Sequence, residues 1–383
     1  MTTTMLPPRT GEANHEFKPG LEGVVAAETR LSHVDGQKGE LIIGGFPLEA
    51  WAGEATFEET VYLLWHGDVP STQALMDFRQ QLAALRTLPN AVVALLAAAA
   101  QQQLPAMTAL RMAAGALDLD SRADETEFEQ AARLLARLPT IVATYWRLRN
   151  GQTPVAPEPA LNHAANYLYM LTGARPNDAQ VRGMETYLNT VVDHGLNAST
   201  FAARVIIATD TDLTSALVGA LGALKGPLHG GAPGPALDMA FAIGQAEHAE
   251  PYLRAKLERG ERLMGFGHRI YKVRDPRAEM LSQAAEKMFR AGGGDLALYT
   301  LAKAVEETAV RLLAEYKPGR NLQTNVEFYT ALLLHGLGLE TDLFTPTFAI
   351  SRAGGWLAHC FEQQATGRLI RPQSRYVGPI RQR

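Results

Sequence analysis

Apolar positions recur with a helical period along most of the chain. The segment TFEETVYLLWHG opens with a capping box, Thr56 with Glu59, and closes at a glycine. Apolar residues share one helical face in 71–85, and similar stripes run through 184–192 and 301–312. Because these patterns fill the chain, we predict an almost all-α protein of many packed helices.

Breaks between the helical segments are short. Prolines are predicted to divide the helical material at Pro105, Pro139, Pro176 and Pro227. Alternating strand patterns are scarce, and the best candidate is GELIIGGF, residues 39–46, as a short strand or hairpin.

The domain organisation is predicted from what the chain lacks and from one glycine-rich loop. No repeat of fixed period is visible, which argues against a solenoid. The loop KGPLHGGAPGP, residues 225–235, is a plausible hinge. No long linker is present, so a second domain would be inserted and closely packed.

Composition narrows the class of protein. The 383 residues are 46% hydrophobic and 20% charged, as in an ordinary globular protein, and the net charge of −4 favours no nucleic-acid partner. The single cysteine, Cys360, excludes a disulfide framework. Residues 1–16 lack a signal peptide's apolar core and are expected to be a loose tail. The most apolar run, 91–100, is too short for a bilayer, so we expect a cytoplasmic protein with no membrane partner.

Common catalytic motifs are missing. The chain has no P-loop, no HExxH and no G-x-S-x-G, and no histidine pair has metal-ligand spacing. Any chemistry is therefore expected to use protein acids and bases without a metal.

Two glycine-flanked histidines are the first candidates for such chemistry. His229 stands in the loop 225–235, where glycines let the backbone approach a ligand closely. His268 follows GFG and precedes a cluster of cations that suits a polyanionic ligand. The plainer readings are a loop histidine without a task and a solvated basic helix start. The cations are Arg269, Lys272, Arg274 and Arg277.

Further candidates lie near helix ends. His194 follows Asp193 and would equally suit a satisfied core histidine. In TNVEFYTALLL, Glu327 is either an acid that suits a helix N-terminus or a catalytic base. Arg352 and Arg371 are isolated cations in a basic C-terminal part. Together these residues fit acid–base chemistry on a small polycarboxylate or a phosphorylated carrier.

The motifs GPLHGGAP, GFGHRIYKVRDPR and NVEFY, in this order and spacing, resemble the citrate synthase family in its short bacterial and archaeal form. The resemblance extends from residues 20–39 to 371–379. It implies an all-α homodimer whose subunit has a large domain, 17–229 with 338–383, and a small domain, 230–337.

The resemblance also implies a reaction and site residues. Acetyl-CoA condenses with oxaloacetate to citryl-CoA, which is hydrolysed, so CoA enters as a substrate thioester and no cofactor is expected. Glu327 would take a proton from the acetyl methyl, His229 would bind the enolate oxygen, and His268 would donate to the oxaloacetate carbonyl. Implied oxaloacetate ligands are His194, Arg277, Arg352 and Arg371, the last from the neighbouring subunit. Implied CoA contacts are Gly265, Phe266, Lys272, Arg320 and Asn325.

This chain departs from the family pattern at three positions. Most members have Asp at Glu327 and Glu at Gly195, and an arginine is common at Gly44. The first two departures occur together in a subset of bacterial members, which have NVEFY in place of NVDFY. We hypothesise that Gly195 frees the space that the longer Glu327 needs. The short chain implies a dimer without an NADH site. A 2-methylcitrate synthase using propionyl-CoA, or a low-activity regulatory member, remains an alternative.

Overall fold

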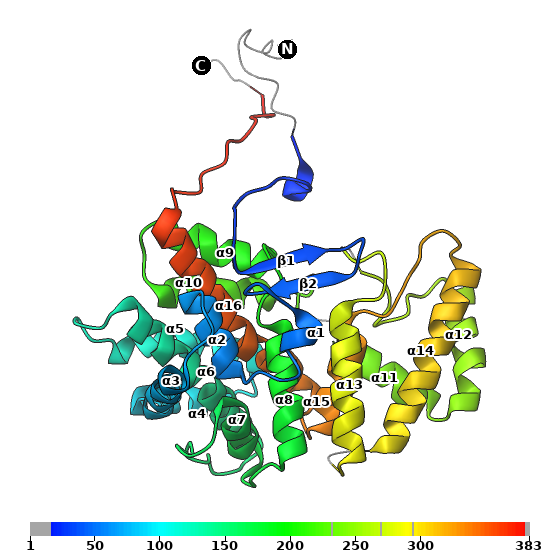
Figure 1. Cartoon of the computed structure of the whole chain (residues 1–383), viewed down its shortest axis with the longest axis horizontal. Coiled ribbons are helices and arrows are strands. Elements are labelled where there is room, and N and C mark those ends of the chain that lie inside the picture. Colours follow the sequence, from blue (N-terminus) through cyan, green and yellow to red (C-terminus); the bar gives the residue numbers. More distant parts are fainter. Residues whose placement is uncertain (1–16, 231–232, 269, 293–294, 380–383) are drawn as a thin grey trace.

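The computed structural model describes residues 17–230, 233–268, 270–292 and 295–379. The predicted tail, 1–16, and Arg269 lie outside these described residues. The all-α prediction is confirmed (Figure 1). In chain order the helices are α1 Leu48–Trp51, α2 Phe57–His66, α3 Thr72–Leu85, α4 Asn90–Gln101, α5 Ala106–Gly115, α6 Glu127–Arg149, α7 His163–Thr172, α8 Asp178–Val191, α9 Ala198–Ile207, α10 Leu213–Leu224, α11 Pro233–Ile243, α12 Ala249–Glu258, α13 Pro276–Arg290, α14 Leu296–Tyr316, α15 Val326–Gly336 and α16 Phe344–Thr366. Short 3-10 turns lie at Pro19–Leu21, Ala116–Asp120, Ala246–His248 and Thr341–Leu343.

The capping signals place helix boundaries where the sequence predicts them. Before α2 the Thr56 hydroxyl accepts from the Glu59 N–H, and the Glu59 carboxylate accepts in return from the Thr56 N–H. Gly67 ends the helix with φ of 87°, a conformation that glycine adopts at no steric cost.

The predicted break at Pro139 is wrong, because α6 continues through this residue. An interior proline costs about 3 kcal/mol through its missing N–H and its steric clash. Residues from Ala131 to Tyr145 are buried, and each fully buried large aliphatic side chain stabilises the fold by about 1.5–3 kcal/mol. Burial of the surrounding helix therefore outweighs the local cost.

The strand prediction at 39–46 is confirmed as part of a larger sheet. β2 Glu40–Ile43 pairs with β3 Phe46–Pro47 and also with β1 Ser32–Asp35, which the periodicity did not indicate. All pairs are antiparallel, in the order β1-β2-β3. In β1 only partly buried and exposed side chains occur, so its sequence carries little apolar alternation.

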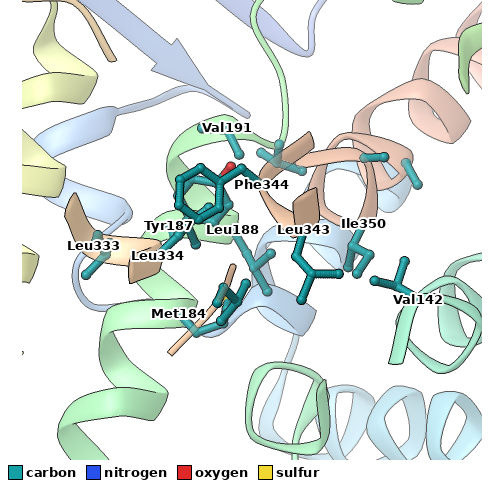
Figure 2. Packing of buried hydrophobic residues seen from close by; sticks show 14 of the residues in the cluster. Val142, Met184, Tyr187, Leu188, Val191, Leu333, Leu334, Leu343, Phe344 and Ile350 are labelled. Atoms are coloured by element: carbon teal, nitrogen blue, oxygen red, sulfur yellow. The ribbon is translucent and has the colours of Figure 1, made fainter. Parts of the chain in front are cut away.

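The core joins the helices that carry the site. Figure 2 shows side chains of α8, α15 and α16 meeting, among them Tyr187, Leu333 and Ile350, all fully buried. α13 packs against both α8 and α15. Because these helices share one core, the residues at their ends are held in fixed relative positions.

Helices α11 to α14 gather at the right of the view in Figure 1. The boundaries of a small domain at 230–337 stay a prediction. Within the described ranges no single helix is long and apolar enough to cross a membrane; α3 and α4 pass only as a pair bent by 64°.

Candidate active site

One cavity of about 880 Å³ gathers the residues that the sequence marks for acid–base chemistry. Its polar lining includes His194, His229, His268, Arg277, Glu327 and Arg352. Arg277 and Glu327 lie in the first turn of their helices and His194 just after α8, whereas His229 and His268 stand in loops and Arg352 lies within α16. Helix ends lie at the rim of the packed core, where a side chain can face a cavity while the helix remains buried.

His229 is oriented by the tight turn that follows α10. Its N–H and that of Gly230 both donate to the Gly226 carbonyl, at 2.9 and 3.0 Å. A Cβ on Gly230 would overlap the carbonyl of Leu224, so only glycine permits this turn. Burial, aided by Arg352, lowers the pKa of His229 to about 4, so the imidazole is neutral near pH 7.

The ring of His229 contacts a serine on its far side. Nε2 lies 2.8 Å from Ser199 Oγ, which leaves Nδ1 for the cavity. Ser199 Oγ also accepts from the Trp356 indole N–H at 3.1 Å and donates to Asn197 Oδ1 at 2.8 Å. Ser199 has a single proton, so it donates either to Asn197 Oδ1 or, when His229 is protonated at Nδ1, to His229 Nε2.

His268 is held as a single tautomer by backbone groups. The N–H groups of Ile270 and Tyr271 donate to its Nδ1 at 3.0 and 3.1 Å. Nε2 must then carry the ring proton. Burial, with Arg277 next in importance, lowers the His268 pKa to about 4. His268 thus offers a neutral Nε2–H donor. Arg277 Nη2, also a donor, lies 3.3 Å from His268 Nε2. A ligand oxygen that contacts both nitrogens would accept a hydrogen bond from each.

Arg277 is oriented by Asp275, the N-cap of α13. The buried carboxylate accepts from Arg277 Nε at 3.0 Å and from Nη2 at 2.8 Å. Its Oδ2 also accepts from the Val326 N–H at 3.2 Å, which ties α13 to the start of α15. This two-point contact fixes the plane of the guanidinium, as recognition of a carboxylate requires.

Arg352 lacks such a partner. Its Nε donates to the Val191 carbonyl at 2.6 Å, and its guanidinium lies 4.5 Å from the centre of the Phe348 ring. Burial lowers its pKa to about 10, so it stays charged near pH 7. Among the described residues no carboxylate forms an ion pair with it, and the cavity therefore keeps a positive charge for an anionic ligand.

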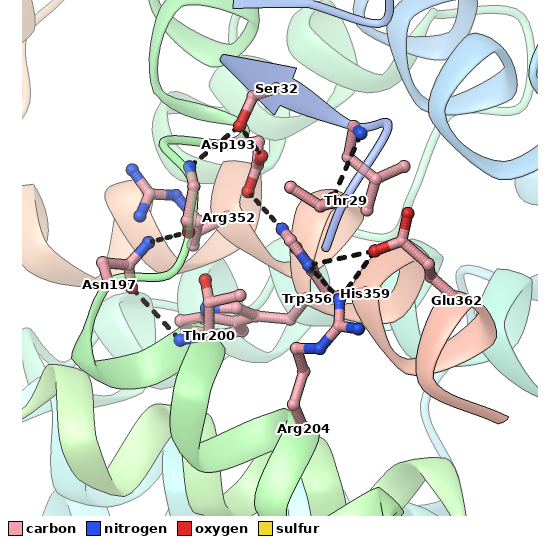
Figure 3. Close-up of polar contacts among 12 residues, drawn as sticks. Thr29, Ser32, Asp193, Asn197, Thr200, Arg204, Arg352, Trp356, His359 and Glu362 are labelled. Atoms are coloured by element: carbon pink, nitrogen blue, oxygen red, sulfur yellow. Dashed lines mark hydrogen bonds and ion pairs between the residues drawn. The ribbon is translucent and has the colours of Figure 1, made fainter. Parts of the chain in front are cut away.

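His194 is anchored from two sides. Its Nε2 lies 3.0 Å from the Tyr271 hydroxyl, and burial lowers its pKa well below the usual value. Behind it, Asp193 is fully buried and accepts from Ser32 Oγ at 2.5 Å and from His359 Nε2 at 3.1 Å (Figure 3). His359 Nδ1 in turn accepts from Arg204, so the bonds run in one direction.

Glu327 lies in the first turn of α15. Its N–H donates to the Asn325 side chain at 3.0 Å, and no described donor bonds its carboxylate. Burial raises its pKa, while Arg277 opposes the rise. A carboxylate with a raised pKa and free lone pairs beside a cavity suits a general base.

The remaining predicted residues lie outside the cavity lining. Arg371 stands in the extended, exposed segment after α16, which leads away from the helices in Figure 1. Phe266 is buried against Phe328, with ring centres 5.3 Å apart, and the Gly265 carbonyl accepts from the Asn325 N–H at 3.0 Å. Their roles in CoA binding stay predictions, as do those of two residues in neighbouring loops, Lys272 and Arg320.

A Cβ added at Gly195 would not come within 4 Å of Glu327. Gly195 has φ of 60°, and a Cβ there would lie 3.9 Å from Val34 and within 4 Å of no other side chain. A non-glycine residue would be strained by this backbone conformation. Glycine adopts this φ at no steric cost, and the compensation of Glu327 stays a hypothesis.

Sequence reasoning missed the residues that hold the site residues in place: Ser199, Tyr271 and Asp275. Only Asp275 has a local signal, since an aspartate before a proline is typical of a helix start. The other two act across 30 and 77 residues, and no local pattern indicates such a pairing.

Comparisons with known proteins agree on one family. The model of the citrate synthase C-terminal domain matches residues 20–373. The chain is 42% identical to a citrate synthase of Haloferax volcanii over 95% of this chain and 96% of that one. It is 38% identical to a 2-methylcitrate synthase of Mycobacterium tuberculosis over 98% and 94%.

Solved structures give the same result. A citrate synthase of Pyrobaculum aerophilum has a TM-score of 0.87 at 35% identity, with 100% of this chain and 98% of that chain covered. A citrate synthase of Thermoplasma acidophilum, in ternary complex with carboxymethyl coenzyme A and oxaloacetate, has a TM-score of 0.85 at 30% identity, with 96% and 98% covered.

Proposed function

The chain belongs to the citrate synthase family, and from this premise we propose which of its side chains carry out each step. It is an acyltransferase that condenses acetyl-CoA with oxaloacetate and hydrolyses citryl-CoA to citrate and CoA. The observation that supports the assignment of roles is the single cavity that holds Glu327, His229 and His268 together with Arg277 and Arg352. CoA enters as a thioester substrate, and we propose no resident cofactor.

The first step is removal of a proton from the acetyl methyl group by Glu327. A thioester methyl is a very weak acid, so a base alone is insufficient and the developing oxyanion needs a fixed donor. His229 faces the cavity with Nδ1. When the Ser199 hydroxyl donates a hydrogen bond to His229 Nε2, the ring proton is on Nδ1, which then donates to the enolate oxygen.

The second step is attack of the enolate on oxaloacetate. Arg277, Arg352 and His194 line the cavity and would bind the two carboxylates. His268 Nε2–H would donate to the ketone oxygen as it gains negative charge. Because the backbone fixes the His268 tautomer, this donor is in place before the substrate arrives.

We propose that the active form is a homodimer. Arg371 does not line the cavity of its own chain and lies on the extended segment after α16. Such a segment could bring Arg371 to the cavity of a second copy. A mixture of Arg371→Ala and Glu327→Gln subunits would test this, because a heterodimer would regain one intact site.

Release of CoA thiol from acetyl-CoA in the presence of oxaloacetate tests the proposed function. Wild-type protein is expected to release CoA, and Glu327→Gln is expected to release far less. The similarity to a 2-methylcitrate synthase supports one alternative function, which would use propionyl-CoA. The same assay is therefore run with both thioesters. A higher kcat/KM with propionyl-CoA would favour 2-methylcitrate synthesis, and no release with either would overturn both functions.

A further inference from the structure

The turn between β1 and β2 is a rigid feature outside the cavity. Asp35 Oδ1 accepts from the N–H groups of Gln37 and Lys38, at 2.9 and 3.0 Å, and Asp35 pairs with Glu40 across the hairpin. Such a side-chain-to-backbone turn fixes the chain direction locally. Gly39 completes the turn with φ of 73°.

This turn lies directly against the loop that follows His268. The Lys272 N–H donates to the Gly36 carbonyl at 2.8 Å. A Cβ on Gly36 would overlap the backbone carbonyl of Ile270, and one on Gly39 would lie 2.7 Å from Val273 Cγ2. The hairpin therefore leaves this loop no room to move toward it.

The contacted loop is the one that fixes His268. Ile270 and Tyr271 supply the two N–H groups that bind His268 Nδ1, and the Tyr271 hydroxyl contacts His194. A shift of the loop would therefore move the donor nitrogen of His268 and the contact with His194 together.

The same hairpin reaches the His194 loop at its other end. Ser32 in β1 donates to Asp193 Oδ2 at 2.5 Å and accepts from the Gly195 N–H at 2.9 Å (Figure 3). Asp193 and Gly195 flank His194 in the chain. One strand and its turn thus contact both loops that carry the oxaloacetate-binding histidines.

We propose that the hairpin Ser32–Glu40 sets the spacing between His194 and His268, and that Ser32 and Gly36 are positioning residues for oxaloacetate. This inference rests on the proposed function. Neither residue lines the cavity, so each acts through the loop that it contacts. The length of the hairpin from Ser32 to Gly36 would determine the distance between the loop that carries His194 and the loop that carries His268.

Gly36→Ala is a clean perturbation of this spacing. Gly36 does not have a left-handed φ, so alanine is compatible with the backbone and only the contact with Ile270 changes. A lost or misplaced hydrogen bond to a charged group costs about tenfold or more in affinity, so we expect the Kd for oxaloacetate to rise at least about tenfold. The KM for acetyl-CoA, measured at saturating oxaloacetate, should change little.

Ser32→Ala should act in the same direction, because it removes both hydrogen bonds to the His194 loop. Ser32→Thr keeps the hydroxyl and should restore affinity. Gly222→Ala is the matched control, since Gly222 in α10 is exposed and a Cβ there meets nothing within 4 Å. Titration calorimetry with oxaloacetate alone gives Kd, and CoA release and thermal unfolding are measured on the same samples.

The inference is overturned if Ser32→Ala and Ser32→Thr bind oxaloacetate alike, or if Gly36→Ala binds as the wild type does. The inference would also be overturned if the variants lost affinity for oxaloacetate and for acetyl-CoA equally and in proportion to their fall in Tm. A purely structural role predicts that result. If Gly36→Ala does not fold, the Ser32 pair decides. Wild-type protein that binds oxaloacetate but releases no CoA would refute the proposed function alone; failure to bind oxaloacetate would refute both.

Discussion

Replacement of Asp275 by asparagine should weaken oxaloacetate binding, because Asp275 orients Arg277 in the cavity lining. The Asp275 carboxylate accepts four hydrogen bonds, from Arg277 Nε, Nη2 and backbone N–H and from the Val326 N–H. An asparagine has one oxygen, so its amide group must face at least one of these donors. The variant thus loses the negative charge of Asp275, and the new amide N–H group faces a donor N–H group of Arg277 or Val326.

The magnitude follows from the number of bonds lost. Hydrogen bonds to charged groups contribute about 1.5–3 kcal/mol each, and the two to the guanidinium are of this kind. Removal of one member of a buried ion pair costs about 3–5 kcal/mol, in agreement with that sum. We expect Asp275→Asn to lower the free energy of unfolding by about this amount. Loss of Arg277 orientation would also cost its charge-assisted hydrogen bonds to the substrate and should raise the KM for oxaloacetate by about 10²-fold.

The assay combines urea unfolding with initial rates of CoA release. The matched control is Asp212→Asn, because Asp212 is also a helix N-cap, accepts from the Ser215 N–H, and is exposed far from the cavity lining. Asparagine is as good an N-cap as aspartate, so this control should be close to neutral. A KM for oxaloacetate within about threefold of wild type in Asp275→Asn would refute the reasoning, since a bidentate orienting contact predicts a far larger effect.

Three further predictions concern the acid–base residues. Burial raises the pKa of Glu327 above its ordinary value of 4.5, so Glu327 loses its base form as the pH falls through that raised pKa. His229 and His268, with pKa values of about 4, are still neutral there. The loss of kcat/KM for acetyl-CoA at low pH should therefore set in above pH 4.5 and be absent in Glu327→Gln. Ser199→Ala should lower kcat by about threefold to tenfold, the effect of one orienting hydrogen bond, without changing the KM for oxaloacetate; an unchanged kcat would contradict the role of Ser199. Glu327→Asp should change kcat alone, and much faster turnover without a change at Gly195 would argue against the compensation hypothesis.

Local signals predicted much of the fold. The capping box at Thr56 and the glycine at the end of α2 act within one helix. All the residues that take part lie in one short stretch of sequence, so the pattern can be recognised there. At Pro139 the local rule failed because burial of α6 by distant helices outweighs the proline's cost. Strand β1 was missed for a related reason, since its pairing with β2 and its contacts to distant loops hold it in place.

The candidate site shows the same division. His229, His268 and Glu327 are marked by short motifs because their turns and caps are local. Ser199 and Tyr271, which orient His229 and His194, are separated from these residues by 30 and 77 positions. The roles of Ser199 and Tyr271 depend on how α9 and the loop after His268 pack against the cavity. The periodicity of apolar residues carries no information on this packing.

The neutral state of the cavity histidines has a consequence for the cell that contains this protein. His229 and His268 have pKa values of about 4, and that of His194 is well below its usual value. Histidines with ordinary pKa values would gain and lose protons between pH 6 and 8, and the attraction for a dianion would vary with them. In the proposed site the positive charge comes from Arg277 and Arg352, and arginines do not titrate in that range. Substrate affinity is thus insulated from fluctuations of physiological pH, and flux through the reaction would follow the supply of its two substrates.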